Sequence, residues 1–376
     1  MQAQRTSPTE LLKRRIAERG PITIAAFMET CLADPGFGYY RTRDPFGRDG
    51  DFTTAPEISQ IFGELIGLWC VEVWRGMGAP PCVRLIELGP GRGTLMADAL
   101  RAARLVPAFL DAVELHLVET SPVLRVRQAE TLRTVGPDPR WHATLDAVPA
   151  GPAIVIANEF LDAMPVRQFV HRADRWHERC VGLDRSGALA YCLSEGALDD
   201  PGIIPAPLRA RTPEDALVEV RPAAGEVLEA LARRGARHAL AALIVDYGHV
   251  AQGPGETLQG VRGHRYADPL CDIGAVDLTA HVDFAALADA ARDAGLEVWG
   301  PTTQGAFLLQ LGLAERCVRL AASVPPDTAR TVEAAAARLV ETGQMGDLFK
   351  VVALTSATLP APPPFRTPMQ KTEAET

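Results

Sequence analysis

Short apolar segments recur along this chain, and helical stretches lie between several of them. The segments are VRLIEL (83–88), ELHLVE (114–119), AIVIAN (153–158), ALIVDYG (242–248), LEVWG (296–300) and LFKVVALT (348–355). Helical patterns follow the first segment at 94–105 and precede the fifth at 283–295. Strands that alternate with helices are typical of a parallel sheet with helices on both faces. We therefore expect an α/β fold with a doubly wound, mostly parallel sheet.

Three regions depart from this alternation. They are a helical stretch at 8–33, alternating strand-like segments at 166–200 with a proline-rich connection at 201–213, and a long polar, glycine-rich loop at 249–281. The last residues are rich in proline and polar side chains, which predicts a disordered tail. The expected domains are an N-terminal helical cap region (1–80), a core (81–165 and 236–358), a small inserted subdomain (166–235) and the tail (359–376).

Composition excludes several classes of protein. The 47 acidic residues outnumber the 38 basic ones, and this net charge of −9 argues against broad binding of nucleic acid. No apolar run reaches the roughly 20 residues of a bilayer span, so no membrane insertion is expected. The first residues contain no apolar stretch after their basic residues, which argues against a secretory signal. These features predict a cytoplasmic protein.

A glycine-rich turn lies between the first core strand and its helix. It reads Glu87-Leu-Gly89-Pro90-Gly91-Arg-Gly93, and such glycines let a backbone approach a ligand closely at a helix N-terminus. Its spacing is not that of a dinucleotide fingerprint, and it lacks the ending of a P-loop. Glu119, which ends the second strand, can accept hydrogen bonds from both hydroxyls of a ribose. The pattern suits an adenosine ligand with a carboxylate at its other end, such as S-adenosylmethionine.

A second polar segment follows the third strand, at Asn158-Glu159-Phe-Leu-Asp162. Ligands of doubly wound sheets lie at the carboxyl ends of the strands, so we expect this segment to face the glycine turn. Glu159 and Asp162 are three residues apart and would share a face in one helical turn. Two carboxylates could hold a guanidinium by charge-assisted bonds and orient one nitrogen. The alternative is that Asp162 caps a turn and Glu159 is merely exposed.

Upstream of the glycine turn, Thr54 and Glu57 have the spacing of a helix-capping box. An apolar face follows at helical spacing, formed by Ile58, Phe62, Leu65, Ile66, Trp69 and Val73. Asp51, three residues before Thr54, has no such structural explanation. Acidic and histidine side chains also occur in the long loop, at His264, Asp268, Asp272, Asp277 and His281. Their spacings match no compact metal motif, so no metal site is expected.

Nine blocks together resemble the MidA family, which includes the mitochondrial methyltransferase that assists assembly of respiratory complex I. They are PGFGYY (35–40), GDFTTAPEISQIFGELIGLW (50–69), LIELGPGRGTLMAD (85–98), VETSP (118–122), ANEFLDAMPVRQF (157–169), DYGH (246–249), RGHRYADPL (262–270), DLTAHVDF (277–284) and MGDLFKVVAL (345–354). The resemblance covers about 35–355 and implies a seven-stranded S-adenosylmethionine-dependent methyltransferase. It also implies a protein substrate, a subunit of NADH dehydrogenase that is methylated on arginine. If the source is a eukaryote, it implies a location in the mitochondrial matrix.

The resemblance and the residue patterns together define the expected site. The expected cofactor-binding residues are Glu87, Gly89, Pro90, Gly91, Gly93, Glu119, Asn158, Asp51 and Thr54. The family resemblance implies that the block from Asp51 to Glu57 folds over the site. Glu159 and Asp162 are the expected catalytic pair. The alternatives are a small-molecule methyltransferase and a non-catalytic assembly chaperone that binds the cofactor for stability.

Overall fold

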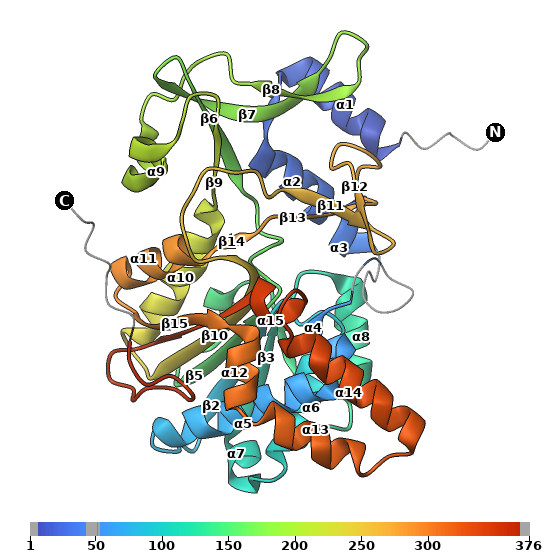
Figure 1. Ribbon diagram of the computed structural model, residues 1–376, viewed down its shortest axis with the longest axis vertical. Helices are drawn as coiled ribbons and strands as arrows, with labels where there is room; N and C mark the ends of the chain where they lie inside the picture. The colour runs from blue at the N-terminus through green and yellow to red at the C-terminus, as the bar shows by residue number, and fades with distance from the viewer. Residues whose placement is uncertain (1–6, 43–50, 52, 369–376) are drawn as a thin grey trace. The chain divides into compact units, whose positions relative to one another are not determined.

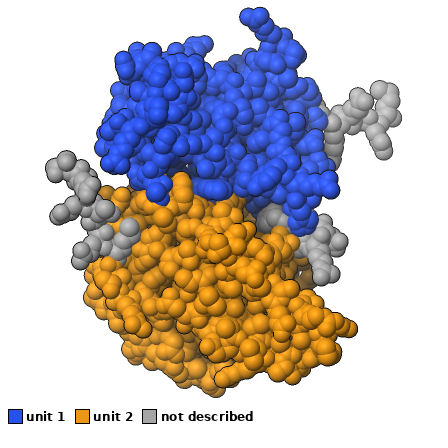
Figure 2. Space-filling view, viewed as in Figure 1, with its two compact units in different colours: residues 1–52, 162–224, 251–281 blue, residues 53–161, 225–250, 282–376 orange. Residues whose placement is uncertain are grey.

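The computed structural model describes residues 7–42, 51 and 53–368 (Figure 1). The chain divides into two compact units, which Figure 2 distinguishes by colour. Unit 1 comprises residues 1–52, 162–224 and 251–281, and unit 2 comprises residues 53–161, 225–250 and 282–376. These boundaries differ from the sequence-based ones, by a few residues at 162–165 and 225–235 and by whole segments in two places. Residues 53–80 belong to unit 2 rather than to a cap, and residues 251–281 belong to unit 1 rather than to the core.

The main sheet of unit 2 has seven strands in continuous order among the described residues: β15-β16-β10-β5-β2-β3-β4. Their bounds are β2 Val83–Leu88, β3 Val113–Val118, β4 Arg140–His142, β5 Ala153–Asn158, β10 Leu240–His249, β15 Glu297–Thr303 and β16 Phe349–Thr355, and a short strand, β14 Val282–Asp283, pairs with β10. Strands β10 to β4 run parallel, whereas β16 is antiparallel to both neighbours. The predicted doubly wound, mostly parallel sheet is confirmed.

The strand order reverses between β2 and β5. From β2 the chain adds β3 and β4 on one side, and it then returns to add β5 and β10 on the other side. Connections that leave a sheet in opposite directions separate at this point and open a crevice at the carboxyl ends of the strands. Both the glycine turn after β2 and the acidic segment after β5 begin here.

Helices complete unit 2. Their bounds are α4 Ala55–Ile58, α5 Gln60–Gly76, α6 Thr94–Ala103, α7 Pro107–Ala112, α8 Pro122–Leu132, η1 Leu145–Ala147, α11 Phe284–Asp293, α12 Gln304–Gln310, α13 Leu313–Ala321, α14 Pro326–Val340 and α15 Met345–Leu348, with α10 Pro222–Gly235 lying almost wholly in it. Asp283 caps α11 by accepting a hydrogen bond from the backbone N–H of Ala286, as its position before the helical pattern predicts.

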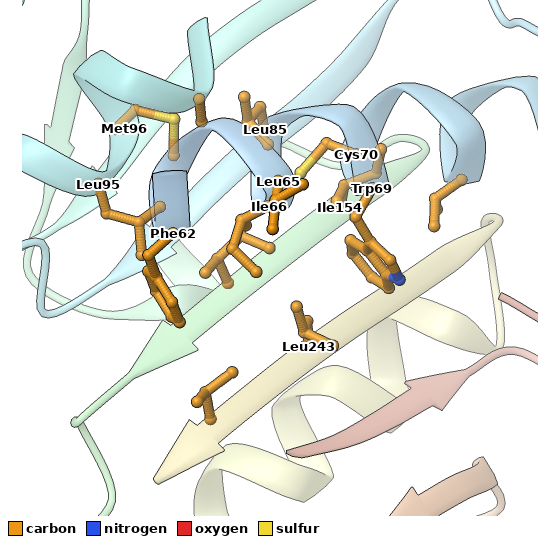
Figure 3. Close-up of a cluster of buried hydrophobic side chains, with 14 of the residues drawn as sticks. Phe62, Leu65, Ile66, Trp69, Cys70, Leu85, Leu95, Met96, Ile154 and Leu243 are labelled. Carbon is orange, nitrogen blue, oxygen red and sulfur yellow. The ribbon is translucent and has the colours of Figure 1, made fainter. Parts of the chain in front are cut away.

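The core of unit 2 lies between α5 and the sheet. The predicted apolar face of α5 meets Leu85 of β2, Ile154 of β5 and Leu243 of β10 (Figure 3). On the α5 side the contacting residues include Phe62, Leu65, Ile66 and Trp69, and none of these seven side chains is more than 3% exposed. Burial of each such side chain stabilises the fold by about 1.5–3 kcal/mol. This packing is the reason that residues 53–80 belong to unit 2.

The predicted capping box at Thr54 does not form. Thr54 is the N-cap of α4, but its side chain makes no capping hydrogen bond, and α4 ends at Ile58. A second helix, α5, starts after Ser59, whose hydroxyl accepts a hydrogen bond from the backbone N–H of Ile61. The Glu57 carboxylate accepts instead from the hydroxyl of Thr94, at 2.5 Å. Glu57, which the local pattern predicts to cap its own helix, therefore bonds to Thr94 from a distant part of the chain.

The predicted disordered tail is ordered in part. Residues 359–368 lie among the described residues, and Leu359 and Phe365 pack against the core of unit 2. The indole N–H of Trp69 donates to the carbonyl of Pro363 at 2.6 Å. Apolar side chains at 359 and 365 supply the burial that holds this proline-rich segment in place. Residues 369–376 lie outside the described part of the chain.

Unit 1 contains antiparallel strands and short helices. Its elements are α1 Pro8–Arg19, β1 Ile22–Thr23, α2 Ile24–Ala33, α3 Tyr39–Thr42, β6 Arg167–Arg172, β7 Arg175–Leu183, β8 Leu189–Leu193, η2 Pro201–Ile203, α9 Ala206–Arg211, β9 Leu217–Val220, β11 Gln259–Arg262, β12 Arg265–Ala267 and β13 Asp277–Thr279. One sheet has the order β1-β7-β6-β9 with β8 beside β7, and all its pairings are antiparallel, as the alternation at 166–200 predicts.

Three local predictions for unit 1 are corrected. The helical stretch at 8–33 is interrupted at Gly20, which has a φ of 88°, and forms two helices with β1 between them. The proline-rich connection at 201–213 contains η2 and α9. The long loop at 249–281 forms the antiparallel sheet β12-β11-β13. Four apolar side chains of this segment are buried in one cluster with α2: Leu258, Ile273, Val276 and Leu278. The segment is polar on average, so its composition does not reveal these buried residues.

Candidate functional site

Three neighbouring strands end in polar residues on the same face of the unit 2 sheet. Side chains of a strand alternate between faces, so Glu87 of β2 continues the row of Val83 and Leu85, which face α5. Glu119 after β3 and Asn158 of β5 continue equivalent rows. All three predicted cofactor-binding residues therefore lie at the carboxyl ends of the strands, next to the reversal in strand order.

The glycine turn after β2 has a backbone that favours glycine at three positions. Gly89, Gly91 and Gly93 have φ values of 61°, 53° and 82°, in the left-handed region that other residues adopt at a cost. The N–H of Gly93 donates to the carbonyl of Pro90 at 2.7 Å, and α6 starts directly after it. A Cβ atom at Gly89 would lie 2.8 Å from Cδ2 of Phe160, so the turn approaches the segment that follows β5.

Two buried oxygen atoms at the strand ends have no hydrogen-bond partner among the described residues. They are Oε2 of Glu87 and Oδ1 of Asn158. Glu87 is 3% exposed, and burial raises the pKa of its carboxyl to about 8. Buried polar atoms are almost always paired in folded proteins. A ligand with polar groups that reach this face of the sheet would satisfy both atoms.

Glu119 is held by groups from α8 and from its N-terminus. Its Oε1 accepts from the backbone N–H of Ser121 at 2.7 Å, and its Oε2 accepts from Nε2 of Gln128 at 3.1 Å. Burial raises the pKa of the Glu119 carboxyl, and these two hydrogen bonds act in the opposite direction. Sequence reasoning missed Gln128, because a glutamine inside a helix carries no pattern that separates it from a surface residue.

The segment after β5 is held by a carboxylate of β10. Asp246 is fully buried, and its Oδ2 accepts from the backbone N–H groups of Phe160 and Leu161 at 3.2 and 2.9 Å. Glu159, just before them, has a φ of 49°, which is uncommon for a residue with a side chain. Sequence reasoning also missed Asp246, although an acidic residue inside an apolar strand segment was the available signal.

The segment from Thr54 to Glu57 contacts two other parts of unit 2, the residue that follows β5 and the first residue of α6. The backbone N–H of Ala55 donates to Oε1 of Glu159 at 3.0 Å, and Nδ2 of Asn158 donates to the same oxygen at 3.2 Å. Glu57 is bonded to Thr94, the first residue of α6. Thr54 itself is 8% exposed. The segment therefore links the start of α6 to the residues that follow β5.

Unit 1 contains a group of acidic and tyrosine side chains. Tyr40 donates its hydroxyl proton to Oδ1 of Asp277 at 2.8 Å, and Asp277 and Asp162 are 3% and 6% exposed. Burial raises the pKa of Asp277 to about 8; the Tyr40 hydrogen bond lowers it, and the charge of Asp162 raises it. Sequence reasoning included Asp277 only in a rejected metal hypothesis and did not consider Tyr40.

Asp51 has partners inside unit 1. Its Oδ2 accepts from the hydroxyl of Tyr39 at 2.7 Å, and its Oδ1 accepts from the backbone N–H of Gly263 at 2.8 Å. These bonds join α3 to the turn between β11 and β12, which is a structural explanation that the sequence did not offer. Among the described residues, no group of three or more histidine, cysteine, aspartate or glutamate side chains has the arrangement of a metal site.

Known proteins of similar sequence are methyltransferases. A family model for S-adenosyl-L-methionine-dependent methyltransferases matches residues 65–302. The mitochondrial protein arginine methyltransferase NDUFAF7 homolog of Drosophila melanogaster is 35% identical, over 93% of this chain and 85% of its own length. Human mitochondrial protein arginine methyltransferase NDUFAF7 is 36% identical, over 91% of this chain and 82% of its own length.

A solved structure extends the similarity to the fold. A protein from Burkholderia thailandensis, crystallised with S-adenosyl-homocysteine, is 31% identical and has a TM-score of 0.77, over 93% of this chain and 91% of its own. The chain belongs to this methyltransferase family. It is an S-adenosylmethionine-dependent methyltransferase, and the resemblance drawn from the sequence blocks is confirmed.

The methyltransferase has residues that suit its cofactor. The unpaired oxygens of Glu87 and Asn158 can accept from an ammonium group, and Glu119 lies at the strand end where ribose hydroxyls bind in such folds. Gly89, Gly91 and Gly93 carry no side chain, so the backbone of the turn can approach a ligand closely at the start of α6. No helix among the residues described by the structure is long and apolar enough to cross a bilayer.

Proposed function

We propose that this methyltransferase modifies an arginine side chain of a protein, and that the protein is a subunit of the respiratory NADH dehydrogenase whose assembly it aids. Relatives named as protein arginine methyltransferases, about 35% identical over most of the chain, support arginine as the acceptor. The NADH dehydrogenase subunit rests on the family resemblance of blocks such as 157–169. The cytoplasmic location stays a prediction, since the curated relatives are named as mitochondrial.

The observation that carries the choice of arginine is the burial of Asp162 and Asp277 in unit 1. Each is under 9% exposed, and the charge of Asp162 raises the pKa of Asp277. Two buried carboxylates that are close enough for one to raise the pKa of the other form an electronegative group that favours a cationic ligand. A guanidinium offers that charge in a planar fork, which matches carboxylate oxygens with paired hydrogen bonds. The sequence predicts Glu159 and Asp162 as the pair, but Glu159 belongs to unit 2 and Asp162 to unit 1. We propose that Asp162 and Asp277 bind the acceptor arginine instead, with Tyr40 orienting Asp277.

Residues of unit 2 are proposed to hold the cofactor. Glu119 would accept hydrogen bonds from the ribose hydroxyls, and Glu87 and Asn158 would face the amino-acid end of the cofactor. The turn from Gly89 to Gly93 would contact the cofactor through its backbone. Glu159 would border the cofactor on the side of its transferable methyl group. The cofactor supplies an electrophilic methyl group on sulfur. Methyl transfer of this kind depends on in-line placement, and placement alone can supply roughly 7–11 kcal/mol of the barrier.

The test is a methyl-transfer assay with variants of Asp162. Asp162→Asn keeps the shape of the side chain but removes its charge and one acceptor. It should leave cofactor affinity unchanged and lose about 2–4 kcal/mol of transition-state stabilisation, as expected for one preorganised polar contact. The matched control is Asp174→Asn, because Asp174 is exposed and its φ of 55° suits asparagine equally well. Tritiated methyl transfer into an extract of a deletion strain measures the rate, and mass spectrometry identifies the methylated residue.

Each outcome of this assay bears on the proposal. Methylarginine on an NADH dehydrogenase subunit, lost with Asp162→Asn and kept with Asp174→Asn, would support it. Methyl transfer into a small molecule, with none into protein, would contradict the proposed protein substrate. If neither the wild type nor Asp162→Asn transfers methyl groups, and both rescue complex I assembly, the chain acts as a chaperone.

A further inference from the structure

Gln128 occupies an unusual position in unit 2. It lies on α8, is fully buried, and uses both ends of its amide group. Its Nε2 donates to the carbonyl of Gly91 at 2.8 Å and to Oε2 of Glu119 at 3.1 Å. One amide nitrogen therefore connects the middle of the glycine turn to the acidic residue that ends β3.

The orientation of this amide is fixed by Trp141. The indole N–H of Trp141, on β4, donates to Oε1 of Gln128 at 2.8 Å. An indole nitrogen can only donate, so it selects the oxygen end of the amide and leaves the nitrogen end for Gly91 and Glu119. The three hydrogen bonds form one chain from β4 through α8 to the glycine turn.

We propose that Gln128 is a positioning residue for the cofactor: it holds the Glu119 carboxylate and the Gly91 carbonyl in their binding arrangement, and Trp141 sets its direction. This inference rests on the proposed cofactor-binding role of Glu119 and goes beyond it. Without Gln128, the Oε2 atom of Glu119 loses its side-chain donor, and the glycine turn loses its tie to α8. The carboxylate would then sample other rotamers before it could receive two ribose hydroxyls.

The decisive variant is Gln128→Glu. It keeps the size of the side chain and can still accept from Trp141. As a carboxylate it can donate to neither Gly91 nor Glu119, and as a protonated carboxyl it can donate to only one of them. Gln128→Met removes the hydrogen bonds without adding a carboxyl group. If Gln128 only filled space, both variants would bind the cofactor equally well. We expect the dissociation constant for S-adenosylhomocysteine to rise about 30-fold or more in Gln128→Glu, and less in Gln128→Met.

A double variant provides the specific signature. Glu119→Gln together with Gln128→Glu exchanges donor and acceptor, so the amide of residue 119 can donate to the new carboxylate. The double variant should bind S-adenosylhomocysteine more tightly than the product of the two single effects predicts, by about 10-fold. A general loss of packing would give no such recovery.

The matched control is Gln304→Met. Among the described residues of unit 2, Gln304 on α12 is a second fully buried glutamine in a helix. Its Nε2 donates to the carbonyl of Leu339 at 2.9 Å. This variant should lower thermal stability, yet leave the dissociation constant within about 2-fold of the wild type.

Titration calorimetry measures the affinity of each of these variants for S-adenosylhomocysteine and needs no methyl acceptor. Trp141→Phe, which keeps an aromatic ring but removes the donor, should also weaken binding, and it remains informative if a Gln128 variant fails to fold. Wild-type affinity in Gln128→Glu, or equal losses in Gln128→Met and Gln304→Met, would overturn the inference. If Glu119→Ala weakens S-adenosylhomocysteine binding but every Gln128 variant binds normally, Glu119 keeps its cofactor role and the role of Gln128 is contradicted. Normal binding in Glu119→Ala would instead remove that role.

Discussion

The Glu159 side chain accepts a hydrogen bond from the backbone N–H of Ala55 over 3.0 Å. This contact joins the first residue of α4 to the first residue after β5, which are more than a hundred positions apart in the chain. One oxygen of the Glu159 carboxylate, which is proposed to border the cofactor, is therefore already directed by the backbone before any ligand binds. Such fixed groups need little rearrangement during a reaction, which is how preorganised polar contacts favour a transition state.

Asp246→Asn should disturb the placement of Glu159 without touching it. Both oxygens of Asp246 accept backbone N–H groups, from Leu161 and Phe160 on one side and Tyr247 on the other. An asparagine must turn its NH₂ group toward one of these donors. We expect a loss of about 1.5–3 kcal/mol in the free energy of unfolding, with a slower methyl transfer, measured by urea unfolding and the tritium assay. Asp289→Asn, on the surface of α11, is the control. Equal stability of both variants would contradict this role.

Glu119→Ala should weaken binding of S-adenosylmethionine by about 1.5–3 kcal/mol, the usual contribution of hydrogen bonds to a charged group. The cause is loss of the proposed acceptor for the ribose hydroxyls. Titration calorimetry measures the change. Glu114→Ala is the control because Glu114 lies on the same strand, and its carboxylate pairs with Arg84 at 3.6 Å. Unchanged affinity in Glu119→Ala would place the ribose elsewhere.

Gly89→Ala separates backbone strain from close packing. The new Cβ would lie 2.8 Å from the ring of Phe160, at a φ of 61°. Gly78→Ala has the same left-handed strain, at a φ of 84°, but no atom lies within 4 Å of its Cβ. Both variants should lose about 1–2 kcal/mol of stability from strain. Only Gly89→Ala should also lose affinity for S-adenosylhomocysteine, because the displaced turn would no longer lie close to the ligand. Titration calorimetry that finds equal affinity in both variants would contradict this close contact between turn and ligand.

Glu87→Gln should change how stability depends on pH. Burial raises the pKa of Glu87 in the folded protein to about 8, above its ordinary value of 4.5. Between these values the unfolded chain releases a proton that the folded protein retains. The folded state therefore loses stability as pH rises from about 4.5 to about 8, by up to about 1.4 kcal/mol per pH unit.

Glutamine does not titrate, so Glu87→Gln should gain stability relative to the wild type as pH rises through this window. Below pH 4.5 the difference between the two proteins should be independent of pH. Urea unfolding at pH 4, 6 and 8 measures it. Glu72→Gln, which changes a half-exposed carboxylate on α5, controls for the loss of a charge. Parallel pH profiles for Glu87→Gln and the wild type would show that Glu87 does not retain its proton.

The sequence by itself determined six strands of the unit 2 sheet, though not the short edge strand β4, and the position of the glycine turn at its carboxyl end. Apolar runs such as 153–158 mark buried strands, and the glycines at 89, 91 and 93 mark the turn. These signals are local, because strand burial and left-handed backbone depend on residues that are close in the chain. The family resemblance added the cofactor and the methyltransferase fold, which the comparisons confirm. It implied seven strands, and the sheet has seven in continuous order with β14 as an eighth beside β10. The roles of the individual site residues stay predictions.

Only the tertiary structure decided which side chains hold one another. Glu57 bonds to Thr94 rather than capping its own helix, Gln128 joins Gly91 to Glu119, and Asp246 holds the backbone after β5. Each of these partners comes from a distant part of the chain. A carboxylate or an amide bonds to whichever unsatisfied group folding brings within about 3 Å. That meeting depends on the packing of whole strands and helices, so no local pattern of residues specifies it.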